Sequence, residues 1–141
     1  MNIIKINPCR PFKGMHNPEV YPDILKNALI KAYDLNQEAS LLLDEAIHTA
    51  YSKNASPIME DVVEEVFALQ KHGLGLCFQL GGLLRRMVDG IYPESEIFCD
   101  RDGIALNELD TTGFHFLLIG ISDARVQIFM ERLILSAIYY S

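Results

Sequence analysis

Between residues 22 and 88, apolar residues recur every three or four positions, which is the spacing of helices that bury one face. Asn36 is placed to cap the second of these helices, and Ser56-Pro57 is a start signal for the third, with a capping hydroxyl and a proline in the first turn. The spacing predicts four helices, at about 22–34, 37–53, 57–71 and 76–88.

The pattern changes in the remaining parts of the chain, where short apolar segments alternate with turn residues. Residues 114–121 form a continuous apolar run, which is typical of a strand covered on both faces. Ser122-Asp123 then predicts the cap of a long final helix over 123–140. The short segments predict strands at 2–6, 97–99 and 104–106, a turn at 100–103 and one helical turn at 107–109.

Together these elements predict a mainly helical α+β fold, with four to five helices, a few short strands and a long C-terminal helix. A chain of 141 residues that is 50% hydrophobic has the size and the core of one domain, 1–141. Isolated strands do not make an ordinary sheet, for which about 4–6 strands are usual. We therefore expect that the chain is a fragment or insertion region of a larger protein, or that it covers these surfaces by oligomerising.

Charge and composition narrow the possible partners. The chain has 19 acidic and 12 basic residues, a formal net charge of −7, which disfavours nucleic-acid binding by this chain alone. Its apolar runs are far shorter than the roughly 20 residues of a spanning helix, so we expect no membrane partner. Cys9, Cys77 and Cys99 form neither a CxxC motif nor a disulfide framework, and a cytoplasmic location is expected.

The motifs that support catalysis are missing from the sequence. It has no GxxxxGK[ST] phosphate loop, no HxxxH or HExxH metal spacing and no GxSxG nucleophile motif. We therefore predict no catalytic, cofactor-binding or metal-binding residue in this chain, and leave open whether a larger parent protein is an enzyme. The acidic residues Glu60, Asp61, Glu64 and Glu65 predict a solvated helix face rather than a catalytic carboxylate pair.

Two sets of residues are candidates for binding. Arg85 and Arg86 are possible phosphate contacts, with ion pairing to Asp89 as the alternative. The final helix is apolar around most of its circumference, so we expect a homo-oligomer that buries it. The possible interface residues are Phe129, Leu133, Leu135 and Ile138.

Several segments occur in an order that resembles a known family. They are Ile3-Ile4-Lys5-Ile6-Asn7-Pro8, Ser56-Pro57-Ile58-Met59-Glu60-Asp61-Val62, Leu83-Leu84-Arg85-Arg86-Met87-Val88-Asp89-Gly90, Gly103-Ile104-Ala105-Leu106-Asn107-Glu108-Leu109, and the run 116–121 followed by 123–140. This order resembles the middle region of the HerA/FtsK-type motor ATPases, hexameric DNA translocases with a RecA-like core. Cys9 departs from the family, in which an aromatic residue is common at that position.

The resemblance implies a helical insertion region that lacks both the Walker A phosphate loop and the Walker B acidic strand. ATP and Mg²⁺ would then be cofactors of a full-length parent only, and DNA would be contacted only through the full-length assembly. The function it implies is a non-catalytic helical portion of a DNA-translocating ATPase, serving subunit assembly or DNA-motor coupling. The alternative is a stand-alone helical protein-interaction module that oligomerises through its C-terminal helix.

Overall fold

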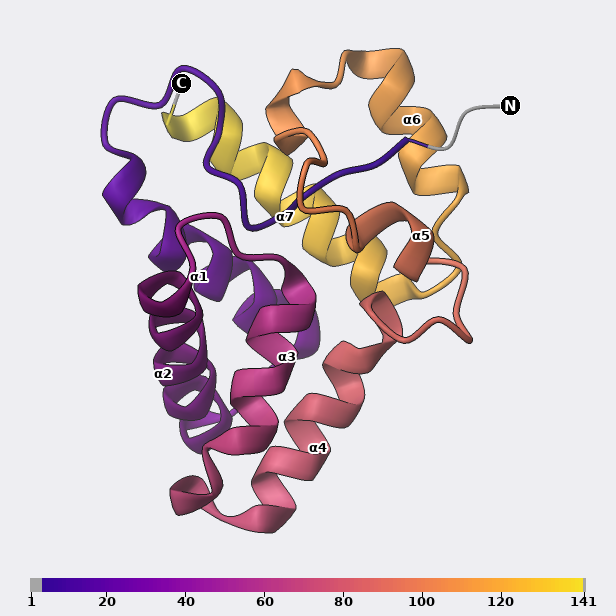
Figure 1. The fold of residues 1–141 in the computed structure, drawn as a ribbon. Helices are drawn as coiled ribbons and strands as arrows, with labels where there is room; N and C mark the ends of the chain where they lie inside the picture. Colours follow the sequence, from indigo (N-terminus) through magenta and orange to yellow (C-terminus); the bar gives the residue numbers. More distant parts are fainter. Residues whose placement is uncertain (1–3, 141) are drawn as a thin grey trace.

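The computed structural model describes residues 4–140, which form a bundle of helices joined by irregular segments (Figure 1). The α-helices are α1 (Tyr21–Tyr33), α2 (Gln37–Lys53), α3 (Met59–Ala68), α4 (Leu74–Leu84), α5 (Ser95–Phe98), α6 (Thr111–Ile119) and α7 (Ala124–Tyr140). Short 3₁₀ turns occur at Pro18–Val20, Gln70–His72, Arg85–Met87 and Leu106–Glu108.

Helix α1 organises the core, because it packs against both α2 and α7, while α3 packs against α2 and α4 (Figure 1). Leu25 and Leu29 of α1 are fully buried, as are Phe129 and Leu133 of α7. Burying a side chain of this size contributes roughly 1.5–3 kcal/mol. The long helices are therefore held together mainly by apolar contacts.

The predicted long helices are confirmed, with small shifts at their ends. Asn36 caps α2 as expected, since its Oδ1 accepts the backbone N–H of Ala39 at 2.9 Å. Helix α3 begins at Met59, two residues later than predicted, so its N-cap is Ile58 and the expected Ser56 cap is wrong. The carboxylate of Asp61 accepts the N–H of Ile58 at 3.0 Å. Asp123 caps α7 by accepting the N–H groups of Arg125 and Val126 at 2.9 and 3.2 Å.

The predicted α+β fold class is wrong, because residues 4–140 contain helices and no named strand. The strand expected over 2–6 is reduced, in its described part, to one isolated parallel bridge between Ile6 and Ile104, and residues 2–3 lie outside the described residues. Residues 95–98 form α5 instead of a strand at 97–99. The segment 104–106 makes the bridge and then enters a 3₁₀ turn, so it offers no ladder to a neighbour.

The strand predicted over 114–121 is also wrong, since most of this run lies in α6. Asp110 caps this helix by accepting the N–H of Gly113 at 2.6 Å. A continuous apolar run is compatible with either a strand or a helix. The helical form satisfies the backbone hydrogen bonds within the segment, whereas a strand would need a neighbour that the described chain does not provide.

Helix α6 is covered on only one side. Leu117 is its one buried residue, while Phe116 and Ile119 are 63% and 68% exposed. The amide of Gln127 in α7 donates to the carbonyls of Leu118 and Ile121, at 3.2 and 2.6 Å, and so holds the end of α6. This short helix is therefore attached partly by polar contacts.

No helix within residues 4–140 combines the length and the apolar character that crossing a membrane requires.

Candidate functional site

A buried asparagine joins three segments that are far apart in the sequence. Asn7 is 2% exposed, and its Nδ2 donates to the carbonyls of Pro57 and Arg101 at 3.0 and 3.4 Å. Its Oδ1 accepts the N–H of Cys9 at 3.0 Å, and its backbone N–H donates to Ile104 at 2.9 Å. Because both ends of the amide are used, Asn7 acts as a structural clamp rather than as a group available to a substrate.

Gly103 lies directly against this clamp. A Cβ atom at this position would come within 2.7 Å of the backbone nitrogen of Asn7 and of the carbonyl carbon of Ile6. Backbone atoms cannot move aside as a flexible side chain can, so only glycine fits here without displacing the bridge.

A second polar centre joins the loop before α5 to the start of α7. Glu94 is fully buried, and its Oε1 accepts the hydroxyl and the N–H of Ser122 at 2.8 and 3.0 Å. The same oxygen accepts the N–H of Asp123 at 3.2 Å, so this carboxylate lies at the positive end of the α7 dipole. Arg86 approaches from the other side, with its Nε 3.3 Å from Glu94 Oε2.

These contacts determine the charge state of Glu94. Burial alone would raise the pKa of its carboxyl, because it disfavours the charged form. Hydrogen bonds from its own backbone N–H, from Ser122 and from Arg86 outweigh burial and hold the pKa below its ordinary value. At neutral pH Glu94 is therefore an ionised structural anchor.

The two arginines proposed as phosphate contacts lie in different surroundings. Arg85 pairs with Asp89 at 2.6 Å, which is the alternative that the sequence had offered. Arg86 faces Glu94, donates to the Ser122 hydroxyl at 2.8 Å and lies 4.4 Å from the centre of the Tyr92 ring. The structure does not bring the two guanidinium groups together around one anion position, and each already has an acidic partner.

The four residues proposed as an interface on the final helix separate into two pairs. Phe129 and Leu133 are fully buried within this chain, whereas Leu135 and Ile138 are 59% and 69% exposed. Ile128 and Tyr139 are also exposed and recur with them at a spacing of seven, three and one residues along α7. We name Ile128, Leu135, Ile138 and Tyr139 the C-terminal stripe.

A groove of about 260 Å³ lies beside the C-terminal stripe, between α1 and α7. Leu135 and Tyr139 line it from α7, together with Arg132, and Lys31 lines it from α1. Lys31 and Arg132 are exposed, and no ion pair joins either of them to a carboxylate within the described part of the chain. The stripe thus combines exposed apolar groups with two uncompensated cations.

The groups considered for catalysis have structural roles. Asp61 pairs with Arg101 at 2.9 Å and Glu65 pairs with Lys53 at 2.7 Å, so the acidic residues of α3 do not form a carboxylate pair in a cleft. Burial raises the pKa of the Cys9 thiol well above its ordinary value, and its Sγ contacts Met59 Sδ at 3.7 Å. A protonated thiol packed in the core is not a nucleophile.

One further cluster is formed by Asp23 of α1 and by Asp44 and His48 of α2. Their ligand atoms all lie within 4.8 Å of one another. The ammonium group of Lys26 contacts Asp44 at 3.0 Å and Asp23 at 3.5 Å, and so occupies the position of a cation between the acids. We interpret the cluster as an exposed ion-pair network that joins α1 to α2.

Two of the most connected polar residues were not identified as such from the sequence. In the sequence Asn7 stands out only as part of an Ile-Asn-Pro motif, and Glu94 follows Pro93 with no periodic signal around it. The Asp44–His48 spacing of four residues on a predicted helix was a detectable signal, but its partner Asp23 lies on another helix.

Comparison with known proteins does not assign a function to these surfaces. Neither a family model, nor a curated protein, nor a solved structure matches this chain.

Proposed function

We propose that this chain is a non-catalytic assembly module that self-associates through the C-terminal stripe of α7. The observation that carries the proposal is the exposure of large apolar side chains on a helix whose opposite face is already buried. Leu135, Ile138 and Tyr139 are 59%, 69% and 81% exposed, and they lie within two turns of one another. Adjacent exposed apolar groups of this size are typical of interaction surfaces.

The other face of α7 is buried within the folded chain. Val126, Phe129 and Leu133 pack into the core, on the side where α7 meets α1. The stripe therefore needs a second molecule to be covered. A two-fold dimer is the simplest arrangement, because it brings the same surface of two copies together.

Measuring the mass in solution tests this function. We expect multi-angle light scattering to report about twice the 15.9 kDa of the single chain at high concentration, with dissociation on dilution. Leu135→Glu, which places a charge in the stripe, should give a monomer with unchanged circular dichroism.

Leu41→Glu is the matched control, since Leu41 of α2 is 56% exposed and lies outside the stripe. This variant should associate like the unmodified chain. A monomer at every concentration, or equal dissociation in both variants, contradicts the proposal.

A second candidate function places the module in a HerA/FtsK-like motor, where it would serve subunit assembly or DNA-motor coupling. It is supported by the position of the segments that carry the resemblance. The Ile-Asn-Pro segment, the start of α3 and the segment around Gly103 all converge on Asn7, through its bonds to Pro57, Arg101 and Ile104. Segments that resemble the family in order are thus also joined in space.

The DNA sequence that flanks the coding region of this chain tests the second function. Sequencing the coding region on both sides should reveal a phosphate loop upstream and an acidic strand downstream, and the longer product should hydrolyse ATP faster when duplex DNA is added. An uninterrupted reading frame without these motifs counts against the motor. By itself, residues 1–141 should bind neither ATP nor duplex DNA.

A cytoplasmic location belongs to the same proposal. Cys9, Cys77 and Cys99 are all free thiols, and burial raises the pKa of Cys9 and of Cys99. Unpaired thiols of this kind are usual in a reducing compartment. Microscopy of the tagged protein in its own cell should show a diffuse internal signal and none at the periphery.

A further inference from the structure

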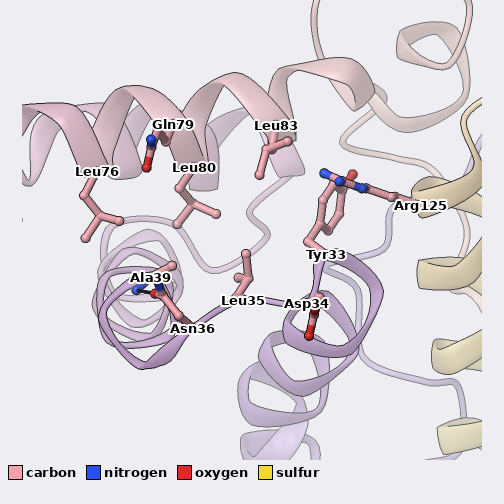
Figure 2. A pocket seen from close by; sticks show the side chains of 10 residues that line it. All are labelled: Tyr33, Asp34, Leu35, Asn36, Ala39, Leu76, Gln79, Leu80, Leu83 and Arg125. Atoms are coloured by element: carbon pink, nitrogen blue, oxygen red, sulfur yellow. Dashed lines mark hydrogen bonds between the residues drawn. The ribbon is translucent and has the colours of Figure 1, made fainter.

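A cavity of about 420 Å³ opens where the connection between α1 and α2 faces α4 (Figure 2). Helix α1 ends at Asp34, which has a left-handed backbone with φ 50°, and the chain turns there toward α2. The first turn of α7 closes one end of the cavity with Arg125. The volume lies at the lower end of the range of about 300–1,000 Å³ that is usual for small-molecule sites.

Leucine side chains form the walls of this cavity. Leu76, Leu80 and Leu83 project from α4 toward Leu35 of the α1–α2 connection (Figure 2). Leu80 is buried and Leu83 is 37% exposed, so the apolar surface extends from the floor to the rim. An aliphatic group would be transferred from water to contact with these leucines, at a gain of roughly 0.8 kcal/mol for each buried CH₂.

The end of the cavity at Arg125 is polar, and two of its groups have no polar partner in the described residues. The guanidinium of Arg125 lies 5.9 Å from the centre of the Tyr33 ring (Figure 2), and no ion pair joins it to a carboxylate within residues 4–140. By contrast, Arg85, Arg86 and Arg101 each have an acidic partner. The hydroxyl of Tyr33, a residue that is only 6% exposed, has no hydrogen-bond partner in the described structure.

The acids near this end do not pair with Arg125. Burial first, and then the charges of Asp123 and Glu94, raise the pKa of the Tyr33 hydroxyl, and both carboxylates contact Arg86 instead. Asp34 also lines the cavity, but Figure 2 shows its carboxylate directed away from the leucines. The cavity therefore presents an unpaired cation at one end and aliphatic walls along its length.

We propose that this cavity binds a small amphipathic carboxylate, with the anionic head on Arg125 and the aliphatic body against Leu76, Leu80 and Leu83. A carboxylate oxygen of the head group would also accept a hydrogen bond from the unpartnered Tyr33 hydroxyl. Since the whole chain carries a net charge of −7, general attraction of anions is excluded as the cause of such binding. The site is separate from the C-terminal stripe, so it does not depend on the assembly function.

Octanoate is a suitable probe, and octanamide and acetate separate the contributions of charge and chain. In ¹H–¹⁵N correlation spectra we expect octanoate to shift the amide signals of α4 and of the first turn of α7 in a saturable way. Octanamide keeps the chain and loses the charge. Its affinity should be lower than that of octanoate by roughly tenfold or more. Acetate, which keeps the charge and loses the chain, should give no saturable shift.

Matched variants locate the site. Arg125→Gln should weaken octanoate binding by roughly tenfold, because it removes a charged hydrogen bond. Lys13→Gln, which removes an exposed cation of the N-terminal loop outside this cavity, should leave octanoate binding as it is in the unmodified chain. Leu83→Asn should also weaken binding, and Leu41→Asn, on an exposed part of α2, should not.

The circular dichroism of each variant shows whether it is folded. The proposal is overturned if folded Arg125→Gln binds octanoate as tightly as the unmodified chain, or if octanamide binds equally well. It is also overturned if octanoate shifts no signals, or only those of residues away from α4 and α7.

Discussion

The α1–α7 interface is held by apolar contacts, whereas the segment from Val88 to Ser122 combines buried apolar residues such as Phe98 and Leu106 with polar contacts. Helices α1 and α7 contribute fully buried apolar residues to a shared core, among them Leu29 and Phe129. The segment 88–122 contains two short helices, and one buried carboxylate connects it to the start of α7. Its longest helix leaves Phe116 and Ile119 in solvent.

The two regions should therefore lose their structure under different conditions. Apolar packing depends on shape and volume, and no titratable group takes part in it. The segment 88–122 is joined by a carboxylate and by close backbone contacts as well as by apolar residues, so its stability depends in addition on charge state and on the absence of a Cβ atom at Gly103. Substitutions and changes of pH can therefore separate the two regions.

The largest effect is expected in the apolar core. Leu29→Ala should lower the free energy of unfolding by about 2–5 kcal/mol, because it removes buried methyl groups and leaves a cavity between α1 and its neighbours. Urea denaturation followed by circular dichroism measures this loss. The exposed Leu41→Ala should change stability by less than about 0.5 kcal/mol, and an equal loss in both variants would refute the assignment of the core.

The next effect tests the close approach at the Asn7 clamp. Gly103→Ala should cost about 1–3 kcal/mol, because the added Cβ meets backbone atoms that cannot move aside. Gly82→Ala is the control, since a Cβ there meets nothing within 4 Å. In the helix interior this control should gain about 0.5–1 kcal/mol, and a neutral Gly103→Ala would show that the clamp is looser than described.

A pH-dependent effect distinguishes the polar segment from the core. The folded state holds the pKa of Glu94 below its ordinary value of 4.5, so its ionised form stabilises the fold above that pH. This contribution is lost as the pH falls through the lower, folded-state pKa. Glu94→Gln should therefore cost about 1–2 kcal/mol at pH 7 and much less under acidic conditions.

Chemical denaturation at several pH values measures this difference. Glu96→Gln, which changes an exposed neighbour in α5, should follow the unmodified chain throughout. If the cost of Glu94→Gln stayed constant with pH, its ionisation would not be what stabilises the segment.

The smallest effect is expected on α6. Phe116→Asp should change the free energy of unfolding by no more than about 0.5 kcal/mol, because the ring is 63% exposed. The same substitution should leave the oligomeric mass unchanged, since Phe116 lies outside the C-terminal stripe. A large loss of stability would mean that α6 is packed more closely than its exposure indicates.

The sequence predicted the long helices well because each has a strong periodic signal and a local start or stop residue. Asn36 and Asp123 were recognisable as caps, and both make the expected bonds. These features depend on residues within one turn of each other, so a single sequence contains the necessary information.

The predictions failed where the structure depends on distant partners. The run 114–121 has the composition of a buried strand, but which form it takes depends on whether another strand is available to pair with it. Likewise, which face of α7 remains exposed follows from the position of α1, so Phe129 and Leu135 could not be separated by periodicity alone. The structural role of Glu94 could not be predicted for the same reason, since its partners Arg86 and Ser122 are distant in the chain.

The clamp at Asn7 has a consequence for the order of events during synthesis. Its bond to Arg101 joins residues that are 94 positions apart. Contacts between distant residues form late, because a long loop must close first. The helices α1 to α4 can begin to associate as they leave the ribosome, and Asn7 can already bond to Pro57, whereas Ile6 has no bridge partner until Ile104 has emerged. During that interval Ile6, which is fully buried in the finished protein, remains accessible to chaperones.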